Sequence, residues 1–517
     1  MNTTALTTIR IEPLIEQIEH LRKQMQQAEE DHQAVLDLVQ PHYQESARNM
    51  LHYLSLRSHE MRDLQEQLSA LAISSFGHSE GYTMGNLDNI LLLLQLLRGD
   101  QIEQPATRVN DNRGYEWAKE RLNRHLVDLF GPCDRGHCSK IMVTLPTEAS
   151  YNYEMVKELI KAGMDVARIN TSHDTPDEWR KMILYIRRAS EETGRHCTVY
   201  MDLSGPKLRT GEVKENEEKQ KKNEEPNFRL FMGDTLEVYR EPIAGEGALL
   251  NEQGGLLRPA RISTTLPEVF DDVRPGEQFC IDDGKIRGIV RQVAPDKFSV
   301  VITQASIKGS RVRADKGINF PDTHLSLPSL TADDYANLPF IAEYADVVGY
   351  SFVRRPDDVR ILQRELEKLG RPEMGIVLKV ETKEAFDRLP NLLLAAMQSS
   401  KVGVMIARGD LAVEIGFDRI AEVQEEILWI CEAAHIPNIW ATEVLDKLAK
   451  KGAATRAEIT DAAMSGRAEC VMLNKGPHIV AAVQMLDNII GRMADHQFKR
   501  KVNLRPLGVA KRFLKER

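Results

Sequence analysis

A lysine and two carboxylates follow two apolar, strand-like runs and have the chemistry to handle a phosphoryl group. Lys379 and Glu381 stand two residues apart after the run Gly375–Leu378, so both side chains point to the same side of the strand. Asp410 follows the run Val402–Ala407 and a glycine that lets a ligand approach the backbone. Two carboxylates suit a divalent cation, and an ammonium neutralises a moving phosphoryl group. The alternative is a buried Lys–Glu pair beside a surface turn.

Such residues need a scaffold that brings several strand ends together, and the chain from Lys140 onward has that pattern. Short apolar runs alternate with amphipathic stretches of helical length, which is typical of parallel strands joined by helices. Eight strands are the number that closes a (β/α)8 TIM barrel. The sequence therefore predicts an α/β fold with strands at 141–144, 166–169, 198–202, 347–351, 375–380, 402–406, 439–442 and 470–473, and helices at 151–162, 176–193, 356–369, 382–396, 418–435 and 456–464.

A stretch of different composition interrupts the barrel pattern between its third and fourth strands. Residues 211–313 begin with the charged run Lys214–Glu225 and continue with β-rich segments separated by Pro and Gly turns. This pattern favours a small all-β lid domain inserted in a barrel loop. Its predicted strands include 235–239, 279–281 and 298–303, and the barrel divides into 137–210 and 314–495.

The first hundred residues (1–100) predict an N-terminal α-helical domain. Apolar residues recur at helical spacing from Leu14 to Met25 and again over Met50–Leu71. Pro41 interrupts the first run, so at least two helices are expected. Helical packing or homo-oligomerisation is the favoured use of this region, and a regulatory ligand site is the alternative.

Two further segments have little patterning of their own. Residues 101–136 form a polar linker around one predicted helix, at about 114–129. Residues 496–517 form a basic C-terminal tail. A solvated or subunit-contacting tail is favoured over a phosphate or nucleic-acid contact.

Composition argues against several classes of protein. The 517 residues carry a net charge of −9 with a pI of about 5.9, which disfavours a general nucleic-acid binder. No apolar run is long enough to cross a membrane, and the N-terminus lacks a secretory signal pattern. Six scattered cysteines favour reduced thiols and a cytoplasmic location. Cys133 and Cys138 resemble half of a zinc site, but no second pair follows at finger-like spacing, so free thiols in a loop are expected.

Polar groups follow five of the predicted strands, and the chemistry of a TIM barrel lies at the carboxyl ends of its strands. Arg168 and Arg209 offer planar guanidinium groups for phosphate oxygens, and Thr442 offers a hydroxyl. Their convergence with the lysine and the carboxylates predicts a metal-dependent, phosphate-handling site. The strand-end residues are Arg168, Asn170, Ser172, His173, Asp202, Lys207, Arg209, Lys379, Glu381, Gly409, Asp410 and Thr442.

The motifs that carry these groups resemble those of the pyruvate kinase family. Ala162–His173 closely resembles the family motif in which an arginine, an asparagine and a serine end the second strand. The resemblance spans about 137–490, and implies a divergent member with an extra N-terminal helical region and without the family's C-terminal regulatory domain. Further matching segments, in the family's order, are Asp202–Gly211, Ile281–Gly284, Lys316–Asn319, Lys379–Glu381, Ala407–Glu414, Ala441–Thr442 and Thr455–Glu458.

The resemblance implies transfer of a phosphoryl group from phosphoenolpyruvate to ADP, giving pyruvate and ATP. Glu381 and Asp410 would bind Mg²⁺ or Mn²⁺, and Lys379 would stabilise the transferring group. Thr442 lies where the family places the proton relay to the enolate. The residues expected to bind substrate are Arg168, Gly409, Asp410 and Thr442, and those expected on the nucleotide side are Asn170, His173, Arg209 and Lys316.

One departure from the family concerns its monovalent cation. Members that need K⁺ bind it through oxygen ligands at positions that here include Asn170, Ser172 and Asp202, but Leu203 removes one oxygen and Lys207 replaces a glutamate. A tethered ammonium near the vacated site can neutralise the same anionic cluster. We therefore predict that K⁺ is not required. The alternative is a solvent-facing Lys207.

Other departures keep different activities open. The family's Gly-Pro-Ala-Ser is replaced at Leu145–Ser150, a lysine by Ser204, a glutamine by Glu443, and the strand-eight loop by Asn474–His478. The alternatives to a pyruvate kinase are another phosphoenolpyruvate or pyruvate-enolate enzyme (a lyase, an aldolase or a specialised phosphotransferase) and a non-catalytic barrel scaffold.

Overall fold

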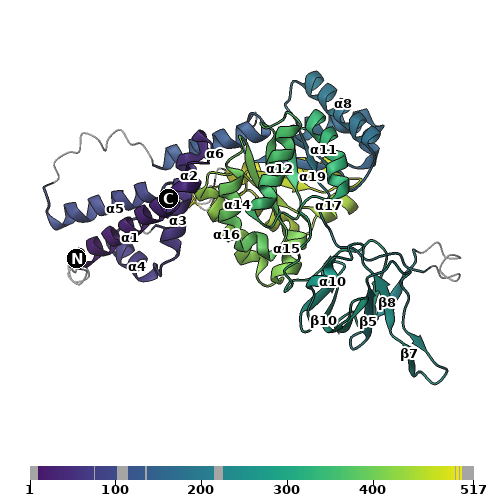
Figure 1. Cartoon of the computed structure of the whole chain (residues 1–517). Helices are drawn as coiled ribbons and strands as arrows, with labels where there is room; N and C mark the ends of the chain where they lie inside the picture. Colours follow the sequence, from purple (N-terminus) through teal and green to yellow (C-terminus); the bar gives the residue numbers. More distant parts are fainter. Residues whose placement is uncertain are drawn as a thin grey trace, which may run out of the picture.

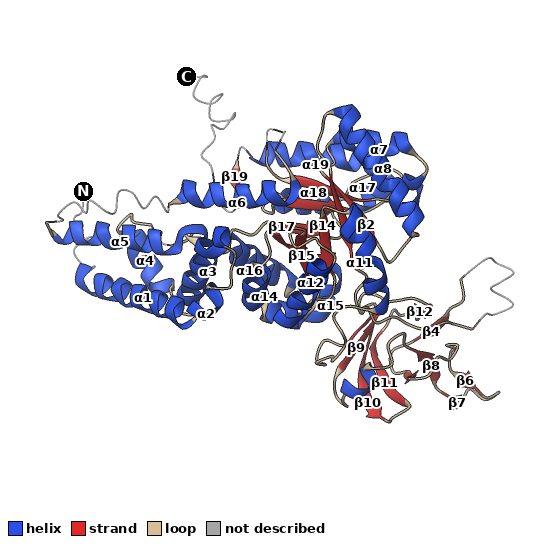
Figure 2. Ribbon diagram, turned by 45° about the horizontal axis from the view of Figure 1, so that its top comes forward, coloured by secondary structure: helices blue, strands red, loops and turns tan. Residues whose placement is uncertain are grey.

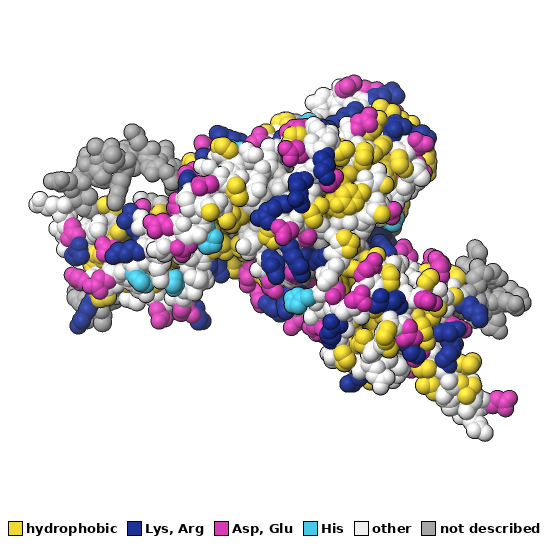
Figure 3. Space-filling model, in the orientation of Figure 1, with side chains coloured by type: hydrophobic (Ala, Val, Ile, Leu, Met, Phe, Trp, Pro, Cys, Tyr) yellow, Lys and Arg dark blue, Asp and Glu magenta, His cyan; other side chains and the backbone are white. Residues whose placement is uncertain are grey.

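The computed structural model describes residues 10–101, 114–214 and 225–502, apart from 75, 134, 136, 495 and 500. Helices form one end of the molecule, an α/β barrel its middle and a β-rich lid the other end (Figure 1). Acidic and basic side chains are interspersed over the face shown in Figure 3. Residues 215–224 of the charged run, part of the linker and most of the basic tail lie outside the described residues. Within those residues, no helix has the length and apolar character that a membrane span requires.

The predicted barrel is confirmed as a closed ring of parallel strands, in the order β1-β18-β17-β16-β15-β14-β3-β2. Each residue of β15 and β16 is buried, as expected for strands covered on both faces. The strands are β1 (Lys140–Thr144), β2 (Val166–Asn170), β3 (Thr198–Asp202), β14 (Val347–Tyr350), β15 (Gly375–Val380), β16 (Val402–Ala407), β17 (Asn438–Ala441) and β18 (Cys470–Leu473).

Helices surround the barrel (Figure 2). Local sequence sets their ends: α8 begins with a capping box between Thr175 and Glu178, has Pro176 in its first turn, and ends at Gly194 in the left-handed conformation. The helices are α7 (Tyr153–Ala162), α8 (Pro176–Thr193), α11 (Ala332–Tyr344), α12 (Pro356–Lys368), α13 (Lys383–Asp387), α14 (Leu389–Ala396), α15 (Arg408–Ile415), α16 (Ile420–Ala433), α17 (Asp446–Lys451), α18 (Arg456–Ser465) and α19 (Ile479–Ala494).

The helices differ from the prediction in two ways. The single helix expected at 382–396 is divided into α13 and α14, because Pro390 lies in the first turn of α14 and has no N–H with which to continue a preceding helix. The short helix α15, which follows β16 directly, was not predicted. This helix matters because Asp410 lies in its first turn.

The linker helix closes the floor of the barrel. Helix α6 (Tyr115–Phe130) places Leu126, Leu129 and Phe130 in one apolar cluster with residues that line the barrel interior. Gly375 and Gly403 make room for it, since a Cβ at either position would come within 2.8 Å or less of Leu129. A segment predicted as a linker is therefore part of the core.

The lid has an apolar core of its own, separate from that of the barrel. Its main sheet has the order β13-β9-β10-β11-β5-β8, and the three predicted strands are found in β5, β9 and β11. The lid elements are β4 (Phe228–Leu230), β5 (Thr235–Tyr239), β6 (Leu249–Leu250), β7 (Leu256–Arg258), β8 (Ala260–Ser263), α10 (Val269–Asp272), β9 (Gln278–Ile281), β10 (Ile286–Val293), β11 (Lys297–Gln304), β12 (Ser310–Val312) and β13 (Ile318–Asn319).

The N-terminal helices pack on the barrel helix α16 through α3. Asn49 donates to the carbonyl of Ala433 at 2.8 Å, and buried His435 lies within hydrogen-bond distance of Ser46 and of the carbonyl of Gly81. The stretch Met50–Leu71 is not continuous, since α3 ends at Arg57 and α4 begins at Arg62. The elements are α1 (Ile11–Asp31), α2 (Gln33–Leu36), α3 (Gln44–Arg57), α4 (Arg62–Ala70) and α5 (Thr83–Arg98), and near the C-terminus β19 (Gln497–Phe498) and β20 (Lys501–Val502).

Candidate active site

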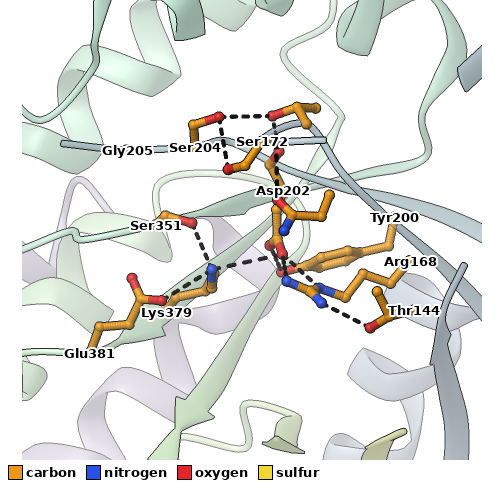
Figure 4. Close-up of polar contacts among 12 residues, drawn as sticks. Thr144, Arg168, Ser172, Tyr200, Asp202, Ser204, Gly205, Ser351, Lys379 and Glu381 are labelled. Atoms are coloured by element: carbon orange, nitrogen blue, oxygen red, sulfur yellow. Dashed lines mark hydrogen bonds and ion pairs between the residues drawn. The ribbon is translucent and has the colours of Figure 1, made fainter. Parts of the chain in front are cut away.

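The carboxylate of Asp202, at the end of β3, is the centre of a buried charge cluster at the barrel mouth (Figure 4). It accepts hydrogen bonds from Arg168 Nε at 2.6 Å and from the Tyr200 hydroxyl at 2.8 Å. Lys379 Nζ lies 3.7 Å from the same carboxylate. Arg168 also donates to Thr144 Oγ1 at 2.8 Å. One carboxylate thus fixes two cationic side chains, from β2 and β15.

Lys379 and Glu381 lie on the same side of the chain, as the two-residue spacing predicted. Their Nζ and Oε1 atoms are 3.1 Å apart, and Lys379 donates to Ser351 Oγ at 2.6 Å. The other Glu381 oxygen accepts from the backbone N–H of Phe352 at 2.6 Å. Both side chains are buried, so the ion pair is held in one geometry by its neighbours.

Asp410 lies in the first turn of α15, where its negative charge is favourable to the helix dipole. Its carboxylate accepts from Lys207 Nζ at 2.9 and 3.0 Å. The adjacent Gly409 faces Thr442: a Cβ on this glycine would lie 3.6 Å from the threonine methyl. Lys207, Asp410 and Thr442 therefore belong to one neighbourhood, although they come from three separate segments of the chain.

The charges of the cluster support one another. Burial alone would lower the pKa of Lys379, but the carboxylates of Asp202 and Glu381 outweigh it and raise that pKa. Burial opposes ionisation of Asp202, but Arg168 and Lys379 hold its pKa below the ordinary value. Burial raises the pKa of Glu381, and the nearby charge of Asp410 adds to the rise. The lysine is therefore cationic at neutral pH, and a further positive charge beside Glu381 would favour the ionised form of its carboxylate.

A divalent cation bound by Glu381 and Asp410 would supply this positive charge, and the hard oxygens of the two carboxylates suit Mg²⁺ or Mn²⁺. No group of three or more His, Cys, Asp and Glu side chains with the arrangement of a metal site occurs in the described residues. A divalent cation takes six or more oxygen ligands, so two carboxylates leave positions for substrate and water. Cys133 and Cys138 are free cysteines in the segment before β1, as the sequence predicted.

Thr442 lies on an unusual stretch of backbone directly after β17. Thr442 and Glu443 both have positive φ angles, 68° and 58°, a conformation that costs a non-glycine residue energy. Arg408 supports this turn by donating to the carbonyls of Ala441 at 2.8 Å and Thr442 at 2.5 Å, while it also pairs with Asp461 at 2.6 Å. The turn holds the Thr442 hydroxyl beside Gly409.

Three of the residues expected on the nucleotide side, His173, Arg209 and Lys316, lie near the segments that connect barrel and lid, whereas Asn170 ends β2. Arg209 forms an isolated bridge with Gly317, and its guanidinium pairs with Asp315 at 3.4 Å. His173 lies within electrostatic range of Arg209 and of Lys475, and partial burial and then Lys475 lower its pKa. Lys475, from the strand-eight loop, was not predicted as a site residue.

Lys316 lines a basic pocket in the lid, and this pocket has a volume of about 690 Å³. The pocket is lined by several cations and by the carboxylate of Asp282. Such a surface suits an anionic ligand. The basic residues are Arg229, Lys285, Arg311, Arg313 and Lys316.

The side chains that were expected to surround K⁺, or the Lys207 ammonium in its place, bind other partners. Asn170 Oδ1 accepts from the backbone of Ser172 at 3.2 Å, and the Ser172 hydroxyl donates to Ser204 at 3.2 Å. Asp202 binds Arg168 and Lys379 as described. Lys207 instead donates to Asp410, and its Nζ lies 5.7 Å from the centre of the Phe352 ring. Its role as a K⁺ surrogate stays a prediction.

Sequence reasoning did not find the residues that hold this site in place. Glu414, one turn after Asp410 in α15, accepts from Asn319 Nδ2 of the lid strand β13 at 3.0 Å. Burial raises the pKa of Glu414 to about 7. Asp334 accepts from the backbone N–H of Ser204 at 2.8 Å and thereby fixes the loop after β3. These contacts join segments far apart in the chain and leave no local pattern.

Comparison with known proteins matches most of the chain to one family. The family model "Pyruvate kinase, barrel domain" matches residues 137–478. The chain belongs to the pyruvate kinase family. Curated relatives include the pyruvate kinases of Staphylococcus saprophyticus (31% identity over 358 residues, 68% of this chain and 56% of the relative) and Bacillus licheniformis (31% over 371 residues, 70% and 58%). The pyruvate kinase of Mycobacterium tuberculosis strain H37Rv is 32% identical over 358 residues, 68% of this chain and 69% of the relative.

The match to the pyruvate kinase family covers the barrel and the lid. Each strand-end residue named from the sequence lies within residues 137–478, whereas the helices α1–α6 lie before them. The chain spans somewhat over half the length of the Staphylococcus and Bacillus relatives. The whole-protein activity of those relatives is therefore a proposal for this chain.

Proposed function

We propose that this protein is a pyruvate kinase, which transfers the phosphoryl group of phosphoenolpyruvate to ADP with a divalent cation as cofactor. The observation that carries the proposal is the arrangement of Lys379, Glu381, Asp410 and Thr442 at one barrel mouth, in a member of the pyruvate kinase family. A scaffold role would require no such buried, charge-balanced cluster, because buried charges are costly unless they are paired.

In the proposed mechanism Lys379 faces the transferring phosphoryl group and neutralises the charge that develops on its oxygens. Asp202 keeps that lysine and Arg168 cationic and in position. The cation on Glu381 and Asp410 would supply further positive charge to the phosphate. Arg168 would contact the phosphate oxygens with the guanidinium edge that Asp202 leaves available.

The proton that converts the enolate to pyruvate would come through the Thr442 hydroxyl. The supported turn around Thr442 keeps this hydroxyl near Gly409, whose backbone amide, with that of Asp410, would hold the substrate carboxylate. The cations near His173, Arg209 and Lys316 would bind the acceptor phosphates, and lid closure would exclude water.

Two finer features belong to the same proposal. Turnover would not need K⁺, since Lys207 supplies a fixed positive charge beside Asp410. The N-terminal helices would join copies of the chain into a homo-oligomer. The cytoplasmic location expected from the cysteine content stays a prediction.

The test is pyruvate and ATP formation from phosphoenolpyruvate, ADP and Mg²⁺ or Mn²⁺, with Lys379→Met as the key variant. We expect turnover to fall about 10²–10³-fold or more, the cost of removing one charge-stabilising donor. Lys368→Met, on the exposed surface of α12, is the matched control that should keep its activity.

Two results would count against the proposal. One is absence of ATP formation with either cation, and the other is turnover that survives Lys379→Met. Consumption of phosphoenolpyruvate without ATP would favour the enolate-enzyme alternative, for which exposed Glu443 beside Thr442 is the motivating residue.

A further inference from the structure

Two cysteines lie in the loop between the floor helix α6 and the first barrel strand, far from the proposed active site. Cys133 and Cys138 are separated by four residues, and the ends of the loop are drawn together because Lys140 Nζ donates to the carbonyl of Pro132. Between them, Arg135 forms ion pairs with barrel and helix carboxylates. The described residues on either side of the thiols are thus held by contacts to the rest of the chain.

The two cysteines lie close together. The Cys133 thiol donates to the Cys138 carbonyl oxygen at 3.9 Å, and each thiol influences the pKa of the other. A disulfide requires Cα atoms within about 7 Å of each other, a separation that contacts of this kind permit. The two side chains are therefore placed for reaction with one another.

The surroundings make the two thiols unequal. The hydrogen bond from Cys133 lowers the pKa of Cys138 to about 6, with help from the charges of Lys140 and Lys119 against the opposing effect of burial. The same hydrogen bond, followed by burial, raises the pKa of Cys133. Since the thiolate is the nucleophile, Cys138 is poised to attack while Cys133 remains protonated.

Cys138 is also the accessible member of the pair. It is exposed, whereas Cys133 is partly buried. Cys138 lines a cavity of about 230 Å³ together with Lys119, a cation that favours a thiolate. The remaining cysteines, which are buried, are Cys197, Cys280, Cys431 and Cys470.

Burial also sets those four cysteines apart chemically. It raises the pKa of Cys280 to about 11 and that of Cys431 to about 12, and it raises the pKa of Cys197 and Cys470 as well. They would remain thiols at neutral pH. The chain therefore has one exposed, thiolate-forming cysteine with a second thiol against it.

We propose that Cys138 is a redox modification site at which a peroxide is reduced, with Cys133 as the resolving thiol. The Cys138 thiolate attacks one peroxide oxygen, the O–O bond breaks, and the departing oxygen takes a proton from solvent to leave as water or an alcohol. The Cys133 sulfur then attacks the sulfur of the resulting sulfenic acid and the S–O bond breaks. The departing hydroxyl takes the Cys133 thiol proton and leaves as a second water as the S–S bond forms. The peroxide takes up the two electrons that the thiols lose.

The disulfide would fix the connection between the floor helix and β1. Helix α6 ends at Phe130, which is buried inside the barrel floor, and β1 begins at Lys140. Modification here would act on the scaffold beneath the strands rather than on the residues at the mouth. The proposal does not depend on the identity of the substrate.

The test uses the full-length protein treated with hydrogen peroxide and then with a thiol-alkylating reagent under denaturing conditions, followed by intact and peptide mass spectrometry. The wild type should lose two hydrogen atoms per chain, in a cross-link between Cys133 and Cys138 that a dithiol reverses. Cys133→Ser should instead accumulate a dimedone-reactive sulfenic acid at Cys138. Cys138→Ser should form neither product.

A second measurement keeps the proposal falsifiable if oxidation alters folding. The rate of alkylation of Cys138 by iodoacetamide, measured against pH, should have a midpoint near 6 in the wild type and should move toward the ordinary thiol range of about 8.5 in Cys133→Ser. Peroxide treatment that leaves both thiols free, that cross-links separate chains, or that oxidises the buried cysteines first would overturn the proposal. So would a midpoint that does not respond to Cys133→Ser.

Discussion

Replacing Lys207 with methionine should strengthen divalent-cation binding to the free protein. In the structure the Lys207 ammonium lies 2.9 Å from the carboxylate of Asp410, one of the two oxygen donors expected to bind the cation. A cation that approaches Asp410 must displace this ammonium and also experiences its repulsion. Methionine keeps the length and apolar stem of the side chain but removes both effects.

The size of the effect follows from the exposure of the pair. At 2.9 Å, Coulomb's law with an effective dielectric constant of 20 gives roughly 6 kcal/mol as a direct attraction. About a quarter of the lysine side chain and 17% of the aspartate side chain are exposed. Water therefore solvates the aspartate once the lysine is gone, and this solvation offsets most of the lost attraction. We therefore expect a net effect of about 1–2 kcal/mol, or roughly 5- to 30-fold tighter binding.

The assay is titration with Mn²⁺, followed by electron paramagnetic resonance of the free ion, without substrates. Lys285→Met is the matched control, because this lid lysine pairs with Asp282 instead. Unchanged or weaker Mn²⁺ binding in Lys207→Met would refute the competition. In turnover assays we expect KCl to leave the wild type unaffected and to stimulate Lys207→Met, relative to a tetraalkylammonium salt. Strong activation of the wild type by K⁺ would refute the surrogate role.

Two further predictions concern stability, read from urea unfolding. Glu414 has a pKa raised by burial from 4.5 to about 7, so the folded state binds its proton more tightly than the unfolded state, and stability is lost as pH rises through that window. Wild type should lose about 2.5 kcal/mol more than Glu414→Gln between pH 5 and 8; equal losses would show that Glu414 does not titrate there. Phe130→Ala should lower the free energy of unfolding by about 3–5 kcal/mol, because it opens a cavity in the barrel floor. The control Val127→Ala, at an exposed position of the same helix, should lower it by about 0.5 kcal/mol or less. Similar losses for the two variants would mean that α6 does not seal the barrel.

Much of the fold could be predicted because its signals are local. The alternation of apolar runs and amphipathic stretches marked all eight barrel strands to within a residue or two. Likewise, the two-residue spacing of Lys379 and Glu381 fixed their common side. The helix at 382–396 was wrong because periodicity carried the prediction across Pro390.

The role of α6 could not be predicted, because its apolar face gives no sign of what it will cover. The polar composition around that helix indicated a linker. In the structure, one end of the closed barrel has room for Leu129 and Phe130 against its interior side chains. Only the closure of the barrel creates that space. The same holds for Glu414 and Asn319, which are distant in the chain and meet only when the lid returns to the barrel.

The sequence by itself determined which side chains stand at the strand ends, and hence the chemistry available at the barrel mouth, because a residue's place along a strand is a local property. Tertiary structure alone decided which charges are paired. Asp202 became the partner of Arg168 and Lys379, and Lys207 the partner of Asp410, because closing the ring of strands brings these loops within hydrogen-bond distance and burial makes unpaired charges costly.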